Sequence, residues 1–307
     1  MIISASRRTD IPCFYGAWFV KRLQAGHCLV RHPMNANQIG RVSLSKDVVD
    51  CIVFWTKDAH PMMDQLNAIN AFGIPYCFQY TVTPYGTDLE RHVRPKNEIV
   101  ENFRQLSALL GKHRVFWRYD PIIINENYTI KYHEARFAEL CGKLGACTNK
   151  VTISFVDVYT KNNTKGIEAV SPEAACAIAD VFGAIAQAHG IKIEACCEHM
   201  DLTRFGIAKG SCIDIKAIES VCGYRLAIKP EKGQRKLCGC AESIDIGTYG
   251  TCPNGCVYCY ANKSAASAFS NYHKHDNNAA LLSGEVGVAR MIDRKQKSGR
   301  CMIEEGK

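Results

Sequence analysis

The sequence lacks a hydrophobic run long enough to cross a membrane. Its apolar segments are all shorter than the roughly 18 residues that such a span requires. The first ten residues, MIISASRRTD, also lack the basic start, apolar stretch and cleavage site of a secretory signal. We therefore expect a cytoplasmic protein without a membrane partner.

Other patterns are missing as well. No glycine-rich nucleotide fingerprint follows a strand candidate, which counts against a dinucleotide-binding fold. There is no internal repeat and no low-complexity linker, and 22% of the residues are charged, as in ordinary globular proteins. The 307 residues, 47% of them hydrophobic, are enough for one large α/β domain or two smaller ones.

The first two hundred residues alternate short apolar segments with longer amphipathic ones. Strands are predicted at Ile2–Ser6, Cys51–Thr56, Tyr76–Thr83, Arg114–Tyr119, Val151–Val158 and Ile191–Cys196. Helices are predicted between them, at Tyr15–Gln24, Pro61–Ala71, Asn97–Leu110, Tyr132–Leu144 and Pro172–His189. This alternation predicts a parallel α/β fold, either an open doubly wound sheet or a closed or partial (β/α) barrel of the TIM type.

The alternation of short apolar and longer amphipathic segments ends near residue 200. A helix is predicted at Asp214–Val221, a strand at Tyr224–Lys229, and a further helix from Tyr258 to about Asn271. We divide the chain into a (β/α) barrel core at 1–200, an integrated cysteine-rich region at 201–272 and a C-terminal extension at 273–307.

Cysteine is abundant, with 17 residues. The odd number and a reducing compartment argue against a disulfide framework. Seven cysteines are scattered among apolar residues of the first 180 positions, as expected for core packing. Nine others lie between Cys196 and Cys259 and require a chemical explanation.

The segment TCPNGCVYCYAN at 251–262 has Cys-x3-Cys-x2-Cys spacing, formed by Cys252, Cys256 and Cys259. Three thiolates on one loop can bind three irons of a 4Fe–4S cube and leave the fourth iron open. A radical S-adenosylmethionine enzyme requires that open iron to chelate its cofactor. Structural zinc usually takes four ligands from paired knuckles, which fits this spacing poorly, although a zinc site and a redox or structural role stay open.

A second set consists of Cys197, Cys212, Cys238 and Cys240. It suits a second 4Fe–4S cluster, a tetrahedral zinc ion or buried thiols without metal. Cys196 and Cys197 are neighbours, so their side chains point to opposite faces of a strand and only one of them is expected to bind metal.

Polar residues gather at the carboxyl ends of the predicted strands, where a barrel places its active site. We expect Lys57, Gln79, Arg118, Asp120, Ser154 and Glu198 to line this mouth and bind the cofactor. Lys57 or Arg118 would pair with its carboxylate, and Asp120 or Glu198 would bind its amine or ribose hydroxyls. Structural ion pairing around the strand ends is the alternative.

Several segments resemble an uncharacterised bacterial family, domain of unknown function 1848. They are SASRRTDIP at 4–12, VFWTK at 53–57, RYDPI at 118–122, QRKLCGCAESIDIGTYGTCPNGCVYCYAN at 234–262 and HKHDNNAALLSGE at 273–285. The family is noted for a C-terminal cysteine cluster similar to the N-terminal one of radical S-adenosylmethionine enzymes. The resemblance implies Cys252, Cys256 and Cys259 as cluster ligands. It also implies a circular permutation, with a cluster-bearing strand at Ser243–Tyr249 beside Ile2–Ser6.

The sequence thus predicts a radical S-adenosylmethionine enzyme that forms a 5′-deoxyadenosyl radical and abstracts hydrogen from an unknown substrate. Its reductant would be a low-potential donor such as ferredoxin or flavodoxin, and its catalytic residues are not identified. The alternative is a zinc- or iron–sulfur-binding module for nucleic acid or electron transfer. The net charge of +8 suits an anionic substrate or nucleic acid, but a solvated basic tail explains part of it.

Overall fold

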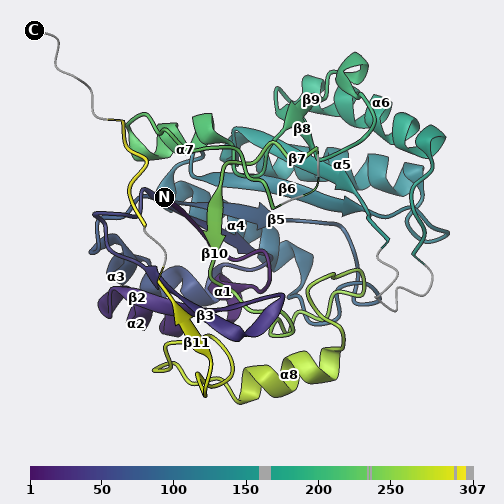
Figure 1. Cartoon of the computed structure of the whole chain (residues 1–307). Coiled ribbons are helices and arrows are strands. Elements are labelled where there is room, and N and C mark those ends of the chain that lie inside the picture. Colours follow the sequence, from purple (N-terminus) through teal and green to yellow (C-terminus); the bar gives the residue numbers. More distant parts are fainter. Residues whose placement is uncertain (159–166, 234, 236, 294–295, 302–307) are drawn as a thin grey trace, which may run out of the picture.

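A computed structural model describes residues 1–158, 167–233, 235, 237–293 and 296–301. Its centre is an eight-stranded sheet in the order β10-β1-β4-β5-β6-β7-β8-β9, in which every pairing is parallel (Figure 1). In chain order the strands are β1 (Ile2–Ala5), β4 (Cys51–Thr56), β5 (Tyr76–Thr81), β6 (Val115–Ile122), β7 (Lys150–Phe155), β8 (Lys192–Cys196), β9 (Ala208–Gly210) and β10 (Ser243–Asp245). The predicted parallel α/β fold is confirmed.

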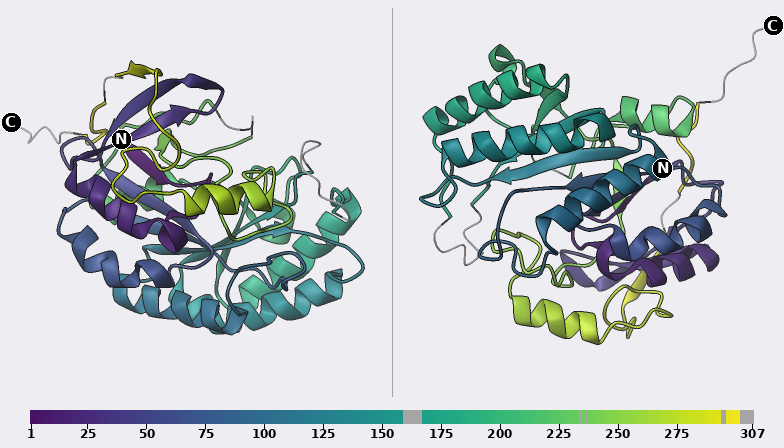
Figure 2. Two further views of the ribbon diagram at one scale, coloured as in Figure 1. Left: turned by 90° about the horizontal axis from the view of Figure 1, so that it is seen from below. Right: turned by 180° about the vertical axis from the view of Figure 1, so that it is seen from behind.

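The helices between these strands cover one side of the sheet. They are α1 (Ile11–Phe14), α2 (Gly16–Gln24), α3 (Leu66–Asn70), α4 (Lys96–Leu110), α5 (Ile130–Leu144) and α6 (Pro172–Ala188), with 3-10 turns at His60–Gln65, Gly145–Cys147 and Thr203–Phe205. In Figure 2 (left), α2 to α6 form an arc in chain order along one side of the curved sheet, and α8 (Ala265–His273) lies on the other side. Helix α7 (Ile215–Cys222) precedes β10 along the chain.

A small second sheet lies on the same side as α8 (Figure 2, left). It pairs β2 (His27–His32) antiparallel to β3 (Asn35–Ser43), and β3 parallel to β11 (Arg290–Ile292). These strands are not predictable from the sequence, because they carry little periodic apolar pattern. They are short or only partly buried.

The last strand of the large sheet lies beside the first. Strand β10 pairs parallel to β1, with Ile2 opposite Ser243 and Ser4 opposite Asp245, as the predicted cluster-bearing strand requires. The edges of the sheet are β10 and β9, and among the described residues no pairing joins them. The sheet is therefore open and forms no closed barrel.

The six strands and five helices predicted for the first two hundred residues are confirmed to within three residues at each end, with Pro61–Ala71 divided between a 3-10 turn and α3. Their apolar runs form the core, in which Phe54, Trp117 and Phe137 are fully buried. Such burial is what makes continuous apolar segments reliable indicators of parallel strands.

Beyond residue 200, one predicted strand is wrong and one predicted helix is confirmed only from residue 265 onward. The predicted strand Tyr224–Lys229 makes only an isolated bridge, between Leu226 and Arg300, because no strand of the described chain runs alongside it. The predicted helix from Tyr258 begins instead at Ala265, after Ser264 caps its first turn. The residues before it turn around the cysteines, with Cys259 N donating to Cys256 O at 3.2 Å.

No helix in the described part of the chain combines the length and the apolar character needed to span a membrane.

Candidate metal and cofactor site

A cavity of about 570 Å³ lies where the carboxyl ends of the parallel strands meet. Parallel strands all end at one edge of the sheet, so residues far apart in sequence converge there. The cavity wall includes Arg7 after β1, Lys57 after β4, Asp120 on β6, Ser154 on β7 and Cys196 at the end of β8. Both predicted sets of cysteines also line it.

Cys252, Cys256 and Cys259 all face this cavity from the loop after β10. The loop passes through Gly255, whose φ of +67° is a backbone conformation that favours glycine. A Cβ at this position would lie 2.7 Å from His92 Cδ2. The close approach to His92 explains why the turn between Cys252 and Cys256 contains glycine.

Hydrogen bonds hold the loop at both ends. Asn262 Nδ2 donates to Cys252 O at 2.7 Å, and Val257 N donates to Leu89 O at 2.9 Å. Asn254 Nδ2 donates at 3.1 Å to Asp10, the residue that caps α1. The three thiols are therefore presented to the cavity by a loop attached to the sheet and to two neighbouring segments.

A buried carboxylate, Glu90, links the loop to the sheet. It accepts hydrogen bonds from Thr83 Oγ1 at 2.6 Å and Lys57 Nζ at 2.8 Å, and also from Lys96 and Tyr258. Burial alone would raise the pKa of Glu90, but the two ammonium groups outweigh it and hold this pKa at about 2. Glu90 is thus ionised and connects both lysines with the aromatic residue between Cys256 and Cys259.

Burial raises the pKa of all three loop thiols, with that of Cys256 at about 12. The Lys57 ammonium opposes this rise at Cys256. Metal coordination requires thiolates, so binding at this loop would displace protons from neutral thiols.

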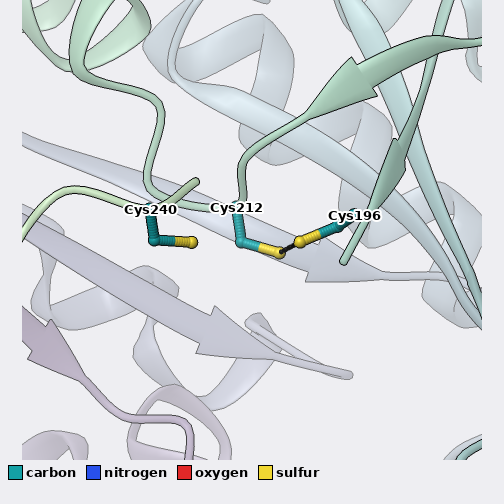
Figure 3. Close-up of side chains that lie close together, drawn as sticks. All are labelled: Cys196, Cys212 and Cys240. Carbon is teal, nitrogen blue, oxygen red and sulfur yellow. Dashed lines mark hydrogen bonds between the residues drawn. The ribbon is translucent and has the colours of Figure 1, made fainter. Parts of the chain in front are cut away.

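Two cysteines of the second set, Cys212 and Cys240, form a compact group with Cys196. The sulfurs of Cys196, Cys212 and Cys240 lie within 4.8 Å of one another, and Cys212 Sγ is 3.0 Å from Cys196 Sγ (Figure 3). Cys197 and Cys238, both predicted as ligands, line the same cavity but are not members of this group. The sequence predicts Cys197, and not its neighbour Cys196, as a member of this set, but the structure turns Cys196 toward Cys212 and Cys240.

Hydrogen bonds among these thiols shift the pKa values of the individual cysteines in opposite directions. Those to Cys240 from Cys196 and Cys212 lower the pKa of Cys240 to about 6, whereas hydrogen bonds with Cys212 and Cys240 raise the pKa of Cys196. A hydrogen bond with Cys240 likewise lowers the pKa of Cys238 to about 6. Part of the group therefore has thiolate character near neutral pH.

Four of the six predicted cofactor-binding residues line the cavity: Lys57, Arg118, Asp120 and Ser154. Arg118 forms an ion pair with Asp120 and donates to Cys212 Sγ at 2.6 Å, while Ser154 donates to Asp120. Arg118 thus faces the second cysteine group, and Lys57 faces the loop through its interaction with Cys256.

The other two predicted residues, Gln79 and Glu198, are not among the residues lining the cavity. Gln79 Nε2 donates to the backbone oxygen of Cys212 at 2.5 Å. Glu198 accepts from Phe155 N at 2.9 Å, and burial raises its pKa to about 7. Both residues support neighbouring segments in this structure.

Sequence reasoning missed Asp245, which joins β10 to β1. Its carboxylate accepts from Ser4 Oγ at 2.8 Å, Ser6 Oγ at 2.6 Å, Arg7 N at 2.8 Å and Gly247 N at 3.0 Å. Glu90 was missed in the same way. Glu90 lies in none of the segments that carry the family resemblance. Asp245 lies in the segment at 234–262, but only the predicted pairing of the two strands could have drawn attention to it.

The guanidinium group of Arg7 lies in the cavity wall with unused hydrogen-bonding capacity. Its guanidinium carbon is 5.0 Å from the centre of the Trp55 ring, and its buried Nη2 has no hydrogen-bond partner among the residues that the structure describes. The Arg118 guanidinium lies over the same ring at 5.1 Å. Cation–π contact places both cations but leaves hydrogen-bonding capacity free on Arg7.

No curated protein and no solved structure matches the chain. A family model does match, over residues 2–261, which include the whole large sheet and the three loop cysteines. By this match the chain belongs to the family described as a domain of unknown function, DUF1848.

Proposed function

We propose that the protein is a radical S-adenosylmethionine enzyme whose 4Fe–4S cluster is bound by Cys252, Cys256 and Cys259. The observation that carries this proposal is that the three thiols share one cavity with polar groups from the ends of β4, β6 and β7. Cluster, cofactor and substrate would thus meet at the functional edge of a parallel sheet.

The donor set of the loop fits such a cluster. Within 251–262 the only side chains of metal-binding type are the three cysteines, with no His, Asp or Glu. Three thiolates bind three irons of a cube and leave its fourth iron without a protein ligand.

One electron from such a cluster, when bound, cleaves the sulfonium of S-adenosylmethionine and yields a 5′-deoxyadenosyl radical. The chain itself would orient the reactants. Lys57, close to Cys256 and held by Glu90, is better placed than Arg118 to bind the carboxylate of the cofactor beside the loop. Asp120 and Ser154 line the same cavity and can bind its hydroxyl or amine groups.

The topology supports the permuted arrangement. In radical S-adenosylmethionine enzymes the cluster loop follows the first strand of a partial barrel, and here the loop follows β10, which pairs parallel to β1 at the edge of a curved sheet. We propose that this sheet is a circularly permuted partial barrel of that type.

The cavity also favours an anionic substrate. Arg7 lines it and has a buried Nη2 that no described residue of the chain pairs with, so a carboxylate or phosphate oxygen would satisfy a group that is otherwise costly to bury. With Arg7 assigned to the substrate, Lys57 is available to bind the carboxylate of the cofactor.

The test is anaerobic reconstitution with iron and sulfide, followed by dithionite and S-adenosylmethionine. We expect 5′-deoxyadenosine from the wild type and none from the Cys256→Ala variant. Cys141→Ala, which changes a buried cysteine of α5 outside the cavity, is the matched control and should retain product formation. A fully loaded wild-type protein that binds no S-adenosylmethionine in calorimetry and forms no 5′-deoxyadenosine would contradict the proposal.

A further inference from the structure

Three cysteines from separate segments converge opposite the loop. Cys196 ends β8, Cys212 follows β9, and Cys240 lies three residues before the start of β10. Figure 3 shows the Cys196 and Cys212 side chains pointing toward one another, with Cys240 pointing toward Cys212. All three are buried and none forms a disulfide. Isolated buried thiols are ordinary core residues, but three converging sulfurs are the donor set of a metal site.

The surroundings hold these sulfurs in place. Ile213 N donates to Cys240 Sγ at 3.3 Å, and Arg118 Nη1 donates to Cys212 Sγ at 2.6 Å. Gln79 Nε2 fixes the backbone of Cys212. Donors of this kind orient thiolate ligands and stabilise their negative charge, as outer-shell groups do around metals.

The spacing distinguishes a single ion from a cluster. With Zn–S bonds of about 2.3 Å, the sulfurs of a tetrahedral zinc site lie about 3.8 Å apart. The group of Cys196, Cys212 and Cys240 lies within 4.8 Å, which is compatible with one ion and too compact for the ligands of a cube.

Cys238 is the candidate for a fourth ligand. It lies two residues from Cys240, lines the cavity and interacts with Cys240 directly. Cys197 has a φ of +63° just beyond the end of β8, and its neighbour Cys196 already faces the group. We propose that Cys196, Cys212, Cys240 and Cys238 bind one tetrahedral metal ion, Zn²⁺, with release of the remaining thiol protons. This site is separate from the loop cysteines and does not depend on radical chemistry.

The test is metal and sulfide analysis of a variant in which Cys252, Cys256 and Cys259 are all alanine, so that the loop cannot contribute. We expect about one zinc per chain and no acid-labile sulfide. Replacing zinc with Co²⁺ should give the intense thiolate-to-cobalt charge-transfer bands and the d–d bands of a tetrahedral four-thiolate site.

The adjacent residues Cys196 and Cys197 provide a matched pair of variants. In the same background, Cys196→Ser should lose the zinc and Cys197→Ser should keep it. If Cys196→Ser fails to fold, the cobalt spectrum of the parent variant still decides the ligand number. Iron with equimolar sulfide at this site, a folded parent variant with no stoichiometric metal, or equal zinc loss in both serine variants would overturn the proposal.

Discussion

Lys57 Nζ lies 2.8 Å from Glu90 Oε1, and the same carboxylate accepts a hydrogen bond from Tyr258 in the cysteine loop. One buried acid therefore couples the end of β4 to the loop. The chain separates Glu90 from Tyr258 by 168 residues, so this contact is formed only in the folded protein.

Glu90→Gln removes the charge that compensates two buried ammonium groups. Because breaking one partner of a buried ion pair leaves the other uncompensated, we expect the free energy of unfolding to fall by about 3 kcal/mol. Urea denaturation measures this. Glu98→Gln is the control: its carboxylate is half exposed and pairs with Arg94 on the surface, so its change should stay within about 1 kcal/mol. Equal losses in the two variants would contradict the role of Glu90.

Gly255→Ala should reduce the iron bound per chain after reconstitution. The new Cβ would force an alanine into positive φ and against His92, which disfavours the turn between Cys252 and Cys256 by about 1–3 kcal/mol. Gly142→Ala on α5 meets only His189 Cε1 at 3.8 Å and should bind iron normally. Adding His92→Ala to Gly255→Ala should restore part of the iron, and an unchanged iron content in Gly255→Ala itself would refute the loop geometry.

Lys57→Gln should weaken S-adenosylmethionine binding to the reconstituted protein about tenfold or more, because the carboxylate of the cofactor loses its cation. Glu90 keeps Lys96 as a partner in this variant. Isothermal titration calorimetry measures the affinity. Lys143→Gln, an exposed lysine that pairs with Glu139 on α5, is the control and should bind with wild-type affinity. If the wild type, Lys57→Gln and Lys143→Gln bind S-adenosylmethionine with the same affinity, Lys57 does not bind the carboxylate of the cofactor.

His133 makes the stability depend on pH. It is fully buried in a neutral form, with Nε2 2.8 Å from Ile123 O and Nδ1 2.7 Å from Tyr119 Oη, and burial lowers its pKa. The unfolded chain takes up a proton near pH 6.5 and the folded chain only at lower pH. This contribution to stability is therefore complete above about pH 7 and falls by up to about 1.4 kcal/mol per pH unit below about pH 6.5.

The measurement is the free energy of unfolding between pH 5 and 8 for the wild type and His133→Gln, compared by the slope below about pH 6.5. The variant should be less stable at neutral pH and should show a shallower decline. His189→Gln, at the exposed end of α6, should retain the wild-type slope. A wild-type slope in His133→Gln would show that another group controls the dependence.

Much of the fold could be predicted from the sequence because buried segments are recognisable as runs of apolar residues. Short continuous apolar runs rich in β-branched and aromatic residues, such as CIVFWT at 51–56, are typical of strands covered on both faces, and β4 has those bounds. The position of β10 beside β1 followed from a family resemblance and not from periodicity, since β10 has only three residues.

The details of the site were less accessible. Neighbouring cysteines on a strand face opposite ways, but sequence does not say which one faces the cavity, so Cys197 was chosen where the structure uses Cys196. No motif assigns a role to Glu90 or Asp245, and their partners lie up to 241 residues away. Arg118 was expected beside the cofactor carboxylate, yet its closest sulfur is that of Cys212.

Iron, sulfide and zinc counting on the anaerobically reconstituted wild type and on the Cys252/Cys256/Cys259 triple alanine variant tests the central claim most directly. We predict about four irons and four sulfides per wild-type chain, none in the variant, and one zinc retained in both. A triple variant that still binds the full iron and sulfide of the wild type would show that the cluster is not bound by these three cysteines.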